Sequence, residues 1–219
     1  MKTIGNIYLV WRKGKGERRI PVGIIRKNAT MGIRFEYLKD GVDKAKTYGF
    51  VAYEGFPDTS KIYKENVIEI FGQRLMRSER NDIKDFYDFW QIDLKYKNDD
   101  FYMLAYTQGI LPTDNYEFLA DFNPVKNIAF ITEISGLSKT KLAPDVLDEG
   151  DILRYEQEPD NKFAPKNTAI KLFKADVFLG YVKIIHSRAF YKRSEELKIS
   201  VHHIEKNGLL NRVFLKVTL

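Results

Sequence analysis

Residues 147–182 read LDEGDILRYEQEPDNKFAPKNTAIKLFKADVFLGYV, and this stretch decides the fold of the C-terminal half. Two strand-like runs, Ile152–Tyr155 and Ala169–Phe173, flank a polar loop, and a Leu-Gly-Tyr-Val run follows directly. Short apolar runs bounded by Gly, Pro, Asn and Asp are typical of strands joined by turns. The stretch therefore predicts neighbouring β-strands with a polar loop between the first two.

The order and spacing of a few residues in this stretch resemble a known family, the HIRAN domain. The matching segments are Gly150-Asp151, Glu158-Pro159, Asn161, Ala169-Ile170 and Leu179–Val182. HIRAN domains are small β-rich modules, found alone in bacterial and phage proteins and fused to DNA-remodelling enzymes. They look like modified OB barrels, so the resemblance implies an OB-like barrel in the C-terminal half.

The resemblance also implies a function. In eukaryotic remodellers, the HIRAN domain grips the 3′ end of single-stranded DNA through two loops, which correspond here to Ser135–Lys141 and Asp160–Asn167. OB-type barrels hold strands through a basic groove and aromatic platforms. Pro165 stands where the family often has an Asp placed to contact a terminal hydroxyl. This departure weakens the implication of end recognition more than that of groove binding.

Composition narrows the possible classes of protein. The chain has 219 residues, of which 44% are hydrophobic, so it is long and apolar enough for packed cores and is not wholly disordered. It has no cysteines, which excludes disulfides, zinc ribbons and thiol catalysis. The apolar run Ile7–Trp11 is too short for a signal-peptide core, so we expect a cytoplasmic protein with no membrane partner.

Positive charge is concentrated in the C-terminal part. The net charge is +6; residues 1–125 carry 20 basic and 18 acidic side chains (+2), and residues 126–219 carry 16 and 12 (+4). Such a gradient suits a polyanionic partner, although many ordinary proteins are mildly basic.

The N-terminal half reads as strands followed by helices. Strands are expected at 4–11, 18–26 and 31–37. A basic, turn-rich tip, Arg12–Glu17, should join the first two. Helical spacing predicts helices at 60–76, 81–90, 98–106 and 114–119, capped in the first three cases by Ser60, Asn81 and Asn98. Asp121–Pro124 is the best linker. The predicted fold class is α+β, with an α+β domain at 1–124 and a mostly β OB-like domain at 125–219.

The N-terminal half has a fainter likeness to the N-terminal subdomain of HipA-type toxin kinases. The likeness rests on the segments GIRFEYL, GFPD, FGQRLMRSERNDIKDF and DDFYMLAYTQG. A Gly-rich ATP loop and an HRD-like catalytic loop are both missing from the sequence. Phosphotransfer is therefore not implied.

The C-terminal half should consist mainly of strands. Those expected are 128–134, 151–156, 168–173 and 177–183, with a helix at 188–195. A terminal hairpin of 197–204 and 209–219 should follow.

Apolar patterning of the hairpin favours a three-residue loop, Lys206–Gly208, over a two-residue Asn-Gly turn. In that register Ile199 faces Leu215 and Val201 faces Val213 on a core face. The opposite face gathers Lys198, Ser200, His202, Arg212, Phe214 and Lys216, with Phe214 as an exposed aromatic ring. A solvated outer face would look the same.

The leading hypothesis is a non-catalytic protein that binds nucleic acid, with single-stranded DNA favoured and no cofactor or metal. Lysines and arginines would meet phosphates, and Phe214 would stack on bases. The candidate binding residues are Lys139, Lys141, Asn161, Lys166, Lys198, Arg212, Phe214 and Lys216.

Two alternatives remain open. The chain could be a protein-interaction component of a toxin–antitoxin or phage-defence system, an idea motivated by the missing kinase core. It could also be a metal-dependent nuclease, because Pro159-Asp160 and Glu196-Leu197-Lys198 fit the loose PD-(D/E)xK pattern. That pattern is short and often arises by chance. The adjacent His202 and His203 point to opposite faces of a strand, which disfavours a shared metal.

Overall fold

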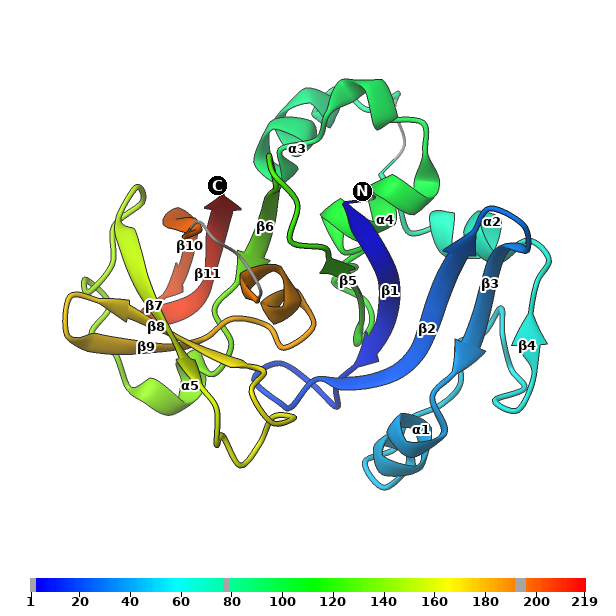
Figure 1. Cartoon of the computed structure of the whole chain (residues 1–219), viewed down its shortest axis with the longest axis horizontal. Helices are drawn as coiled ribbons and strands as arrows, with labels where there is room; N and C mark the ends of the chain where they lie inside the picture. Colours follow the sequence, from blue (N-terminus) through cyan, green and yellow to red (C-terminus); the bar gives the residue numbers. More distant parts are fainter. Residues whose placement is uncertain (1–2, 77–78, 192–195) are drawn as a thin grey trace. The chain divides into compact units, whose positions relative to one another are not determined.

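The computed structural model describes residues 3–76, 79–191 and 196–219, and the chain divides into two compact units. The first unit is Ile4–Asp121; the second unit is Phe122–Leu219, to which Thr3 also belongs. The fold is α+β, with an antiparallel sheet in each unit (Figure 1). The division lies three residues before the predicted boundary between 124 and 125.

The sheet of the first unit has the strand order β4-β3-β2-β1-β5. Its strands are β1 (Ile4–Trp11), β2 (Ile20–Asn28), β3 (Gly32–Tyr37), β4 (Ile62–Tyr63) and β5 (Tyr116–Phe122). The helices are α1 (Lys39–Lys46), α2 (Val67–Gly72), α3 (Ile83–Trp90), the 3-10 helix η1 (Leu94–Tyr96) and α4 (Asp100–Thr107). The three strands expected at the start of the chain are confirmed.

The prediction of a helix at 60–76 is wrong for its first residues. The backbone N–H and the hydroxyl of Ser60 both donate to Asp58 Oδ1, at 2.8 and 2.7 Å, so Ser60 closes a turn and does not cap a helix. Ile62–Tyr63 then pairs with β3, and α2 begins only after Asn66. Residues 77 and 78 lie outside the described residues.

The other helices of the first unit also differ from the prediction. Residues 114–119 contribute to β5, in which every residue after Tyr116 is buried. A strand buried on both faces has no alternation to distinguish it from a helix. The caps of α3 and α4 are Asp82 and Asp99, each one residue after the expected Asn; Asp99 accepts from the backbone N–H of Tyr102.

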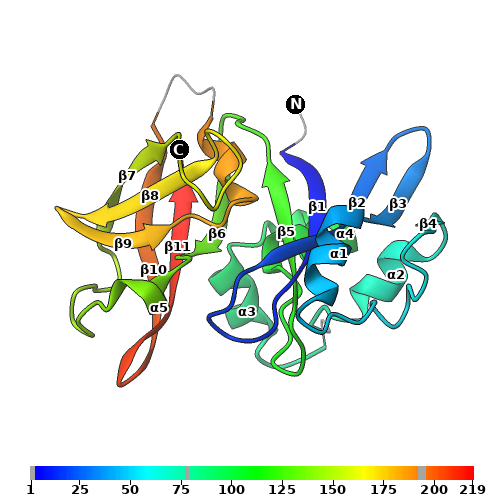
Figure 2. The ribbon, with the colours of Figure 1, turned by 90° about the horizontal axis from the view of Figure 1, so that it is seen from below.

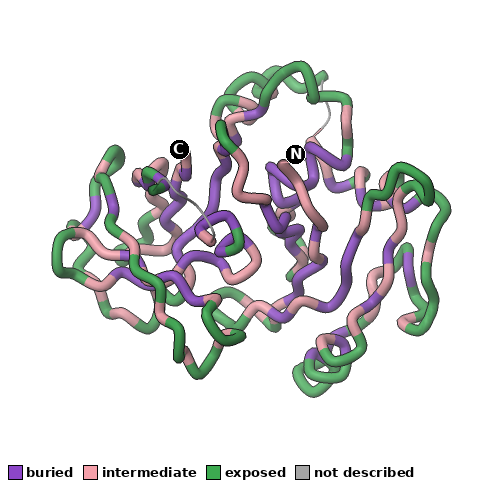
Figure 3. The backbone as a smooth tube through the Cα atoms, in the orientation of Figure 1, coloured by how far each residue is buried: buried purple, intermediate pink, exposed green. Residues whose placement is uncertain are grey.

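Aromatic rings fill the core of the first unit. Phe71 packs against Phe35 and Phe118, with ring centroids 5.1 and 4.9 Å apart. Arg74 is buried beside them, donating from Nε to the carbonyl of Gly109 and forming a two-point ion pair with Asp114. Figure 3 shows buried residues following the strands and exposed residues following the connecting loops.

The second unit is built on a six-stranded sheet in the order β6-β11-β10-β7-β8-β9. The strands are β6 (Ala129–Glu133), β7 (Ile152–Glu158), β8 (Ala169–Lys174), β9 (Val177–Tyr181), β10 (Lys198–Asn207) and β11 (Leu209–Thr218). A short helix, α5 (Leu137–Thr140), and a 3-10 helix, η2 (His186–Phe190), complete it. The predicted strands are confirmed. The helix expected at 188–195 is the earlier and shorter η2, and 192–195 lie outside the described residues.

Pairing of the named strands leaves this sheet open between β9 and β6. One isolated antiparallel bridge spans the opening: Ser135 N–H donates to Tyr181 O at 2.8 Å, and Tyr181 N–H donates to Ser135 O at 2.9 Å. Figure 2 shows β8 and β9 running across β10 and β11, as strands do in a strongly curved sheet. Gly180 permits the bridge, because a Cβ on it would lie 2.5 Å from the carbonyl oxygen of Ser135.

The terminal hairpin has the predicted core face but a different register. Ile199 pairs with Val217 and Val201 with Leu215, two residues away from the expected partners, and these apolar side chains are buried. A bulge at His202 then shifts the pairing, so that His203 faces Phe214. Because a two-residue slip keeps every side chain on the same face, the apolar pattern identified the face but not the register.

Gly180→Ala should lower the free energy of unfolding of the second unit by about 3 kcal/mol, because Gly180 has φ = +135° and no room for a Cβ. Gly150→Ala is the control, with φ = +92° but open space around it, and should cost about 1 kcal/mol. Urea unfolding should be followed by far-UV circular dichroism, since both tryptophans, Trp11 and Trp90, lie in the first unit. Equal losses for the two variants would show that the close approach is unimportant.

Candidate nucleic-acid interface

The outer face of β7, β8 and β9 carries half-buried aromatic rings. On β8, Leu172 is buried, whereas Lys171 and Phe173 on either side of it lie on the opposite face and are half-buried. The ladder sets Phe173 beside Phe178 of β9 and Lys171 beside Tyr181. Alternation along β8 thus turns one ring and one cation outward together.

We call Phe173, Phe178 and Tyr181 the stacking row. The centroid of the Phe178 ring lies 5.7 Å from that of Phe173 and 5.3 Å from that of Tyr181. The register shifts beside Leu179, which allows Phe178 and Tyr181 to share a face although they are three residues apart. The guanidinium carbon of Arg154 lies 4.5 Å from the Phe173 centroid, a cation–π contact. The planes of Phe173 and Phe178 are inclined at 58°, and those of Phe178 and Tyr181 at 75°. The row is therefore a series of inclined rings with a planar cation at one end.

A hydrogen-bonded cluster around Glu158 adjoins the other end of the row. The carboxylate accepts from Asn161 Nδ2 at 2.6 Å and from the Tyr181 hydroxyl at 3.0 Å, and pairs with Lys171 Nζ at 2.6 Å. The side-chain oxygen of Asn161 accepts from the backbone N–H of Phe163 at 2.9 Å, which shapes the loop after β7. Asn161, a predicted binding residue, therefore organises this loop.

The cluster also shifts the ionisation of its members. The hydrogen bond from Asn161 and then the Lys171 ammonium lower the pKa of Glu158. Contact with Glu158 raises the pKa of Lys171, and burial followed by the same carboxylate raises the pKa of the Tyr181 hydroxyl. At neutral pH the cluster therefore holds an ionised carboxylate, an ammonium group and a protonated phenol.

The strands of this face have balanced charge. Every cation on β7, β8 and β9 has a carboxylate partner: the pairs are Arg154–Glu156, Lys171–Glu158 and Lys174–Asp151. Cations without such partners come from the flanking loops.

Four lysines outside the strands, which we call the rim lysines, are exposed and form no ion pair with any described residue. They are Lys139 in α5, Lys141 at its C-terminal end, and Lys162 and Lys166 between β7 and β8. The bridge at Ser135 places the segment entering α5 beside Tyr181, and α5 packs against β9. Three of the predicted residues, Lys139, Lys141 and Lys166, are thus in segments that border the stacking row: α5 with its C-terminal end, and the loop between β7 and β8.

The hairpin residues do not form the predicted surface. Phe214 is 3% exposed, and the guanidinium carbon of Arg212 lies 4.4 Å from its ring centroid, so the expectation of an exposed stacking ring is wrong. Arg212 is also held by the carboxylate of Glu205. Lys198 is exposed and Lys216 half-buried.

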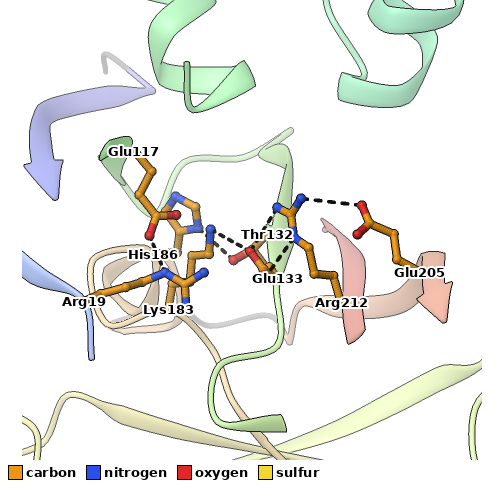
Figure 4. A network of polar contacts seen from close by, with 8 residues as sticks. All are labelled: Arg19, Glu117, Thr132, Glu133, Lys183, His186, Glu205 and Arg212. Carbon is orange, nitrogen blue, oxygen red and sulfur yellow. Dashed lines mark hydrogen bonds and ion pairs between the residues drawn. The ribbon is translucent and has the colours of Figure 1, made fainter. Parts of the chain in front are cut away.

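The hairpin also contributes Arg212 to a buried ionic network that the sequence pattern did not reveal (Figure 4). The carboxylate of Glu133 binds Lys183 Nζ at 3.1 Å and Arg212 at two points, Nε and Nη2, both at 3.3 Å. Lys183 is 1% exposed. His186 Nδ1 lies 2.8 Å from the hydroxyl of Thr132, so this histidine is part of the interior. The network joins β6, β11 and the segment after β9.

Across residues 3–76, 79–191 and 196–219, no three His, Asp or Glu side chains gather in a way that could hold a metal ion. No helix in the described part of the chain is long and apolar enough to cross a membrane. Comparison with known proteins gave no matching family model, no matching curated protein and no matching solved structure.

Glu158→Gln should reduce stability in a pH-dependent way. Because the pKa of Glu158 is lower in the folded state than its ordinary 4.5, its contribution is fully present above that pH and is lost as the pH falls through the folded value. The difference in urea midpoint between wild type and variant should be constant near neutrality and shrink below pH 4.5. Glu54→Gln, at an exposed site, is the control. A difference that stays constant down to pH 3, about 1.5 units below the ordinary 4.5, would contradict the assignment.

Lys183→Met should destabilise the second unit by about 3 kcal/mol, because it leaves part of the buried Glu133 charge uncompensated. Adding Glu133→Gln should recover part of the loss. Circular dichroism during urea unfolding measures both. A loss below about 0.5 kcal/mol, typical of a surface substitution, would show that the pair is unimportant.

Proposed function

We propose that the second unit binds single-stranded nucleic acid, with DNA favoured, on the outer face of β7, β8 and β9. Bases would stack on Phe173, Phe178 and Tyr181, and phosphates would meet the rim lysines. The observation that carries this proposal is the stacking row: three half-buried rings on one face, with Phe178 in contact with both Phe173 and Tyr181.

Half-buried aromatic rings suit base stacking. Every base has a π face, so an aromatic row binds a strand with little dependence on its sequence. Arg154 extends the row, since a guanidinium plane also stacks on bases.

The rim lysines, which lie outside the strands, would make the phosphate contacts. The cations of the strands already have carboxylate partners, so a phosphate would have to compete for them. The rim lysines carry no such partner within the described residues and can exchange water for phosphate. This division resembles the aromatic platform and basic border typical of single-strand-binding barrels.

We also propose that the second unit is an OB-like barrel of the HIRAN kind. The Ser135–Tyr181 bridge supports this proposal, since it joins the two ends of the open strand order. The segments that resemble the HIRAN family lie in β7, β8 and β9 and in the adjoining turns, which also carry the stacking row.

Phe178→Ala should weaken the binding of a fluorescein-labelled single-stranded oligonucleotide by about tenfold, because stacking on one ring contributes about 1–3 kcal/mol. Fluorescence anisotropy measures the Kd. Tyr48→Ala, which removes an exposed ring of the first unit, is the control and should bind like wild type. Binding by Phe178→Ala within twofold of wild type, with an unchanged circular dichroism spectrum, would contradict the proposed surface.

Binding should also weaken with salt in proportion to the number of phosphates met. For four lysine contacts to a single strand, log Kobs should fall with log salt concentration with a slope of about −3. Lys139→Gln combined with Lys141→Gln should make the slope shallower by about 1.4. Lys97→Gln, an exposed lysine of the first unit, should leave it unchanged. A slope that is the same for all three proteins would remove these two lysines from the interface.

A further inference from the structure

A basic cavity of about 480 Å³ lies in the first unit, between the start of β2 and the first turns of α1. Ile20 and Pro21 contribute apolar surface to it. Its charged lining residues are Arg18, Arg19, Lys39, Asp40 and Lys44. The cavity is open to solvent on one side, so it suits a small charged group better than an enclosed apolar ligand.

Close packing of α1 on β2 shapes this cavity. A side chain on Gly41 would overlap the carbonyl oxygen of Pro21, so only glycine allows the helix to lie this near the strand. Val42 and Ala45 are buried on the same helix and anchor it. This packing therefore fixes the position of the helix backbone that carries Lys39 and Lys44.

The lining has an excess of positive charge. It contains four cations and one carboxylate, Asp40, and one of the cations, Arg19, is paired with Glu117. Lys39 and Lys44 have no ion-pair partner among the residues that the structure describes. The side chain of Leu38, at the N-cap of α1, cannot accept a hydrogen bond, so the first backbone N–H groups add to the positive potential.

The loop that leads into the cavity is also basic. Residues 12–19 carry five cations, Arg12, Lys13, Lys15, Arg18 and Arg19, against one acidic residue, Glu17. Of these cations, Arg18 and Arg19 line the cavity, whereas Lys13 lies beside Tyr48 and Asn115.

We propose that this cavity binds a phosphate group, carried by a nucleotide or by a nucleic-acid strand. Arg18, Lys39 and Lys44 would contact phosphate oxygens, since guanidinium and ammonium groups form charge-assisted hydrogen bonds with phosphate. Asp40 would stand at the edge of the site and limit how many anionic groups can enter. This inference does not rest on the function proposed for the second unit.

The test is a calorimetric titration of the full chain with pyrophosphate, with ATP and with a single-stranded oligonucleotide. Combining Lys39→Gln and Lys44→Gln should weaken pyrophosphate and ATP binding by at least about tenfold, because two charge-assisted contacts are lost. Lys46→Gln, in the last turn of the same helix and outside the cavity, is the matched control and should bind like wild type.

Two results would overturn the proposal: no binding of pyrophosphate or ATP at millimolar concentration, or equal weakening by the double variant and by Lys46→Gln. If the double variant also loses affinity for the oligonucleotide, the phosphate belongs to a strand; if not, it belongs to a nucleotide. Phe178→Ala separates this site from the stacking row, because it should leave pyrophosphate binding unchanged.

Discussion

One backbone bridge, between Ser135 and Tyr181, determines how the second unit presents its surface. It joins β9 to the segment that follows β6, and it exists because residue 180 is a glycine. Tyr181 takes part in the bridge through its backbone and in the Glu158 cluster through its hydroxyl. The same residue therefore connects the curvature of the sheet, the loop after β7 and the end of the stacking row. In the first unit, Gly41 has a comparable role between α1 and β2.

Much of the fold could be predicted from local patterns. Alternating and apolar runs identified β1 to β3 and the strands of the second unit. Burial alternates clearly in β3 and β7, whereas β2 and β6 are continuous apolar runs that are buried almost throughout. The pattern failed at β5, which is buried on both sides, and at Ile62–Tyr63, where pairing with β3 overrides the helical spacing. Register in the hairpin follows from its turn, in which Asn207 pairs with Leu209, so the predicted loop Lys206–Gly208 is wrong. The irregularities at His202 and between Glu205 and Lys206 offset each other, and no composition signal marks either of them.

The candidate site was predicted only in part. Lys139, Lys141 and Lys166 lie in α5, at its end and in the loop between β7 and β8, at the border of the aromatic face. The family resemblance had identified both of these basic segments. The sequence analysis did not identify Phe173, Phe178 and Tyr181 as binding residues. The alternation of Lys171 and Phe173 with apolar neighbours in β8 was a signal that could have placed Phe173 on the outer face. Phe214 was misjudged because a hairpin pattern shows which face a ring is on but not what covers that face. Charge pairing, such as that of Arg212, depends on strands distant in sequence.

Photo-crosslinking of an oligonucleotide substituted with 5-iodouracil tests the central claim most directly, because this base crosslinks efficiently to aromatic rings stacked on it. Mass spectrometry of the crosslinked peptides would identify the attachment sites. Attachment is expected at Phe173, Phe178 or Tyr181. Crosslinks found only outside residues 135–182, with none on this face, would contradict it.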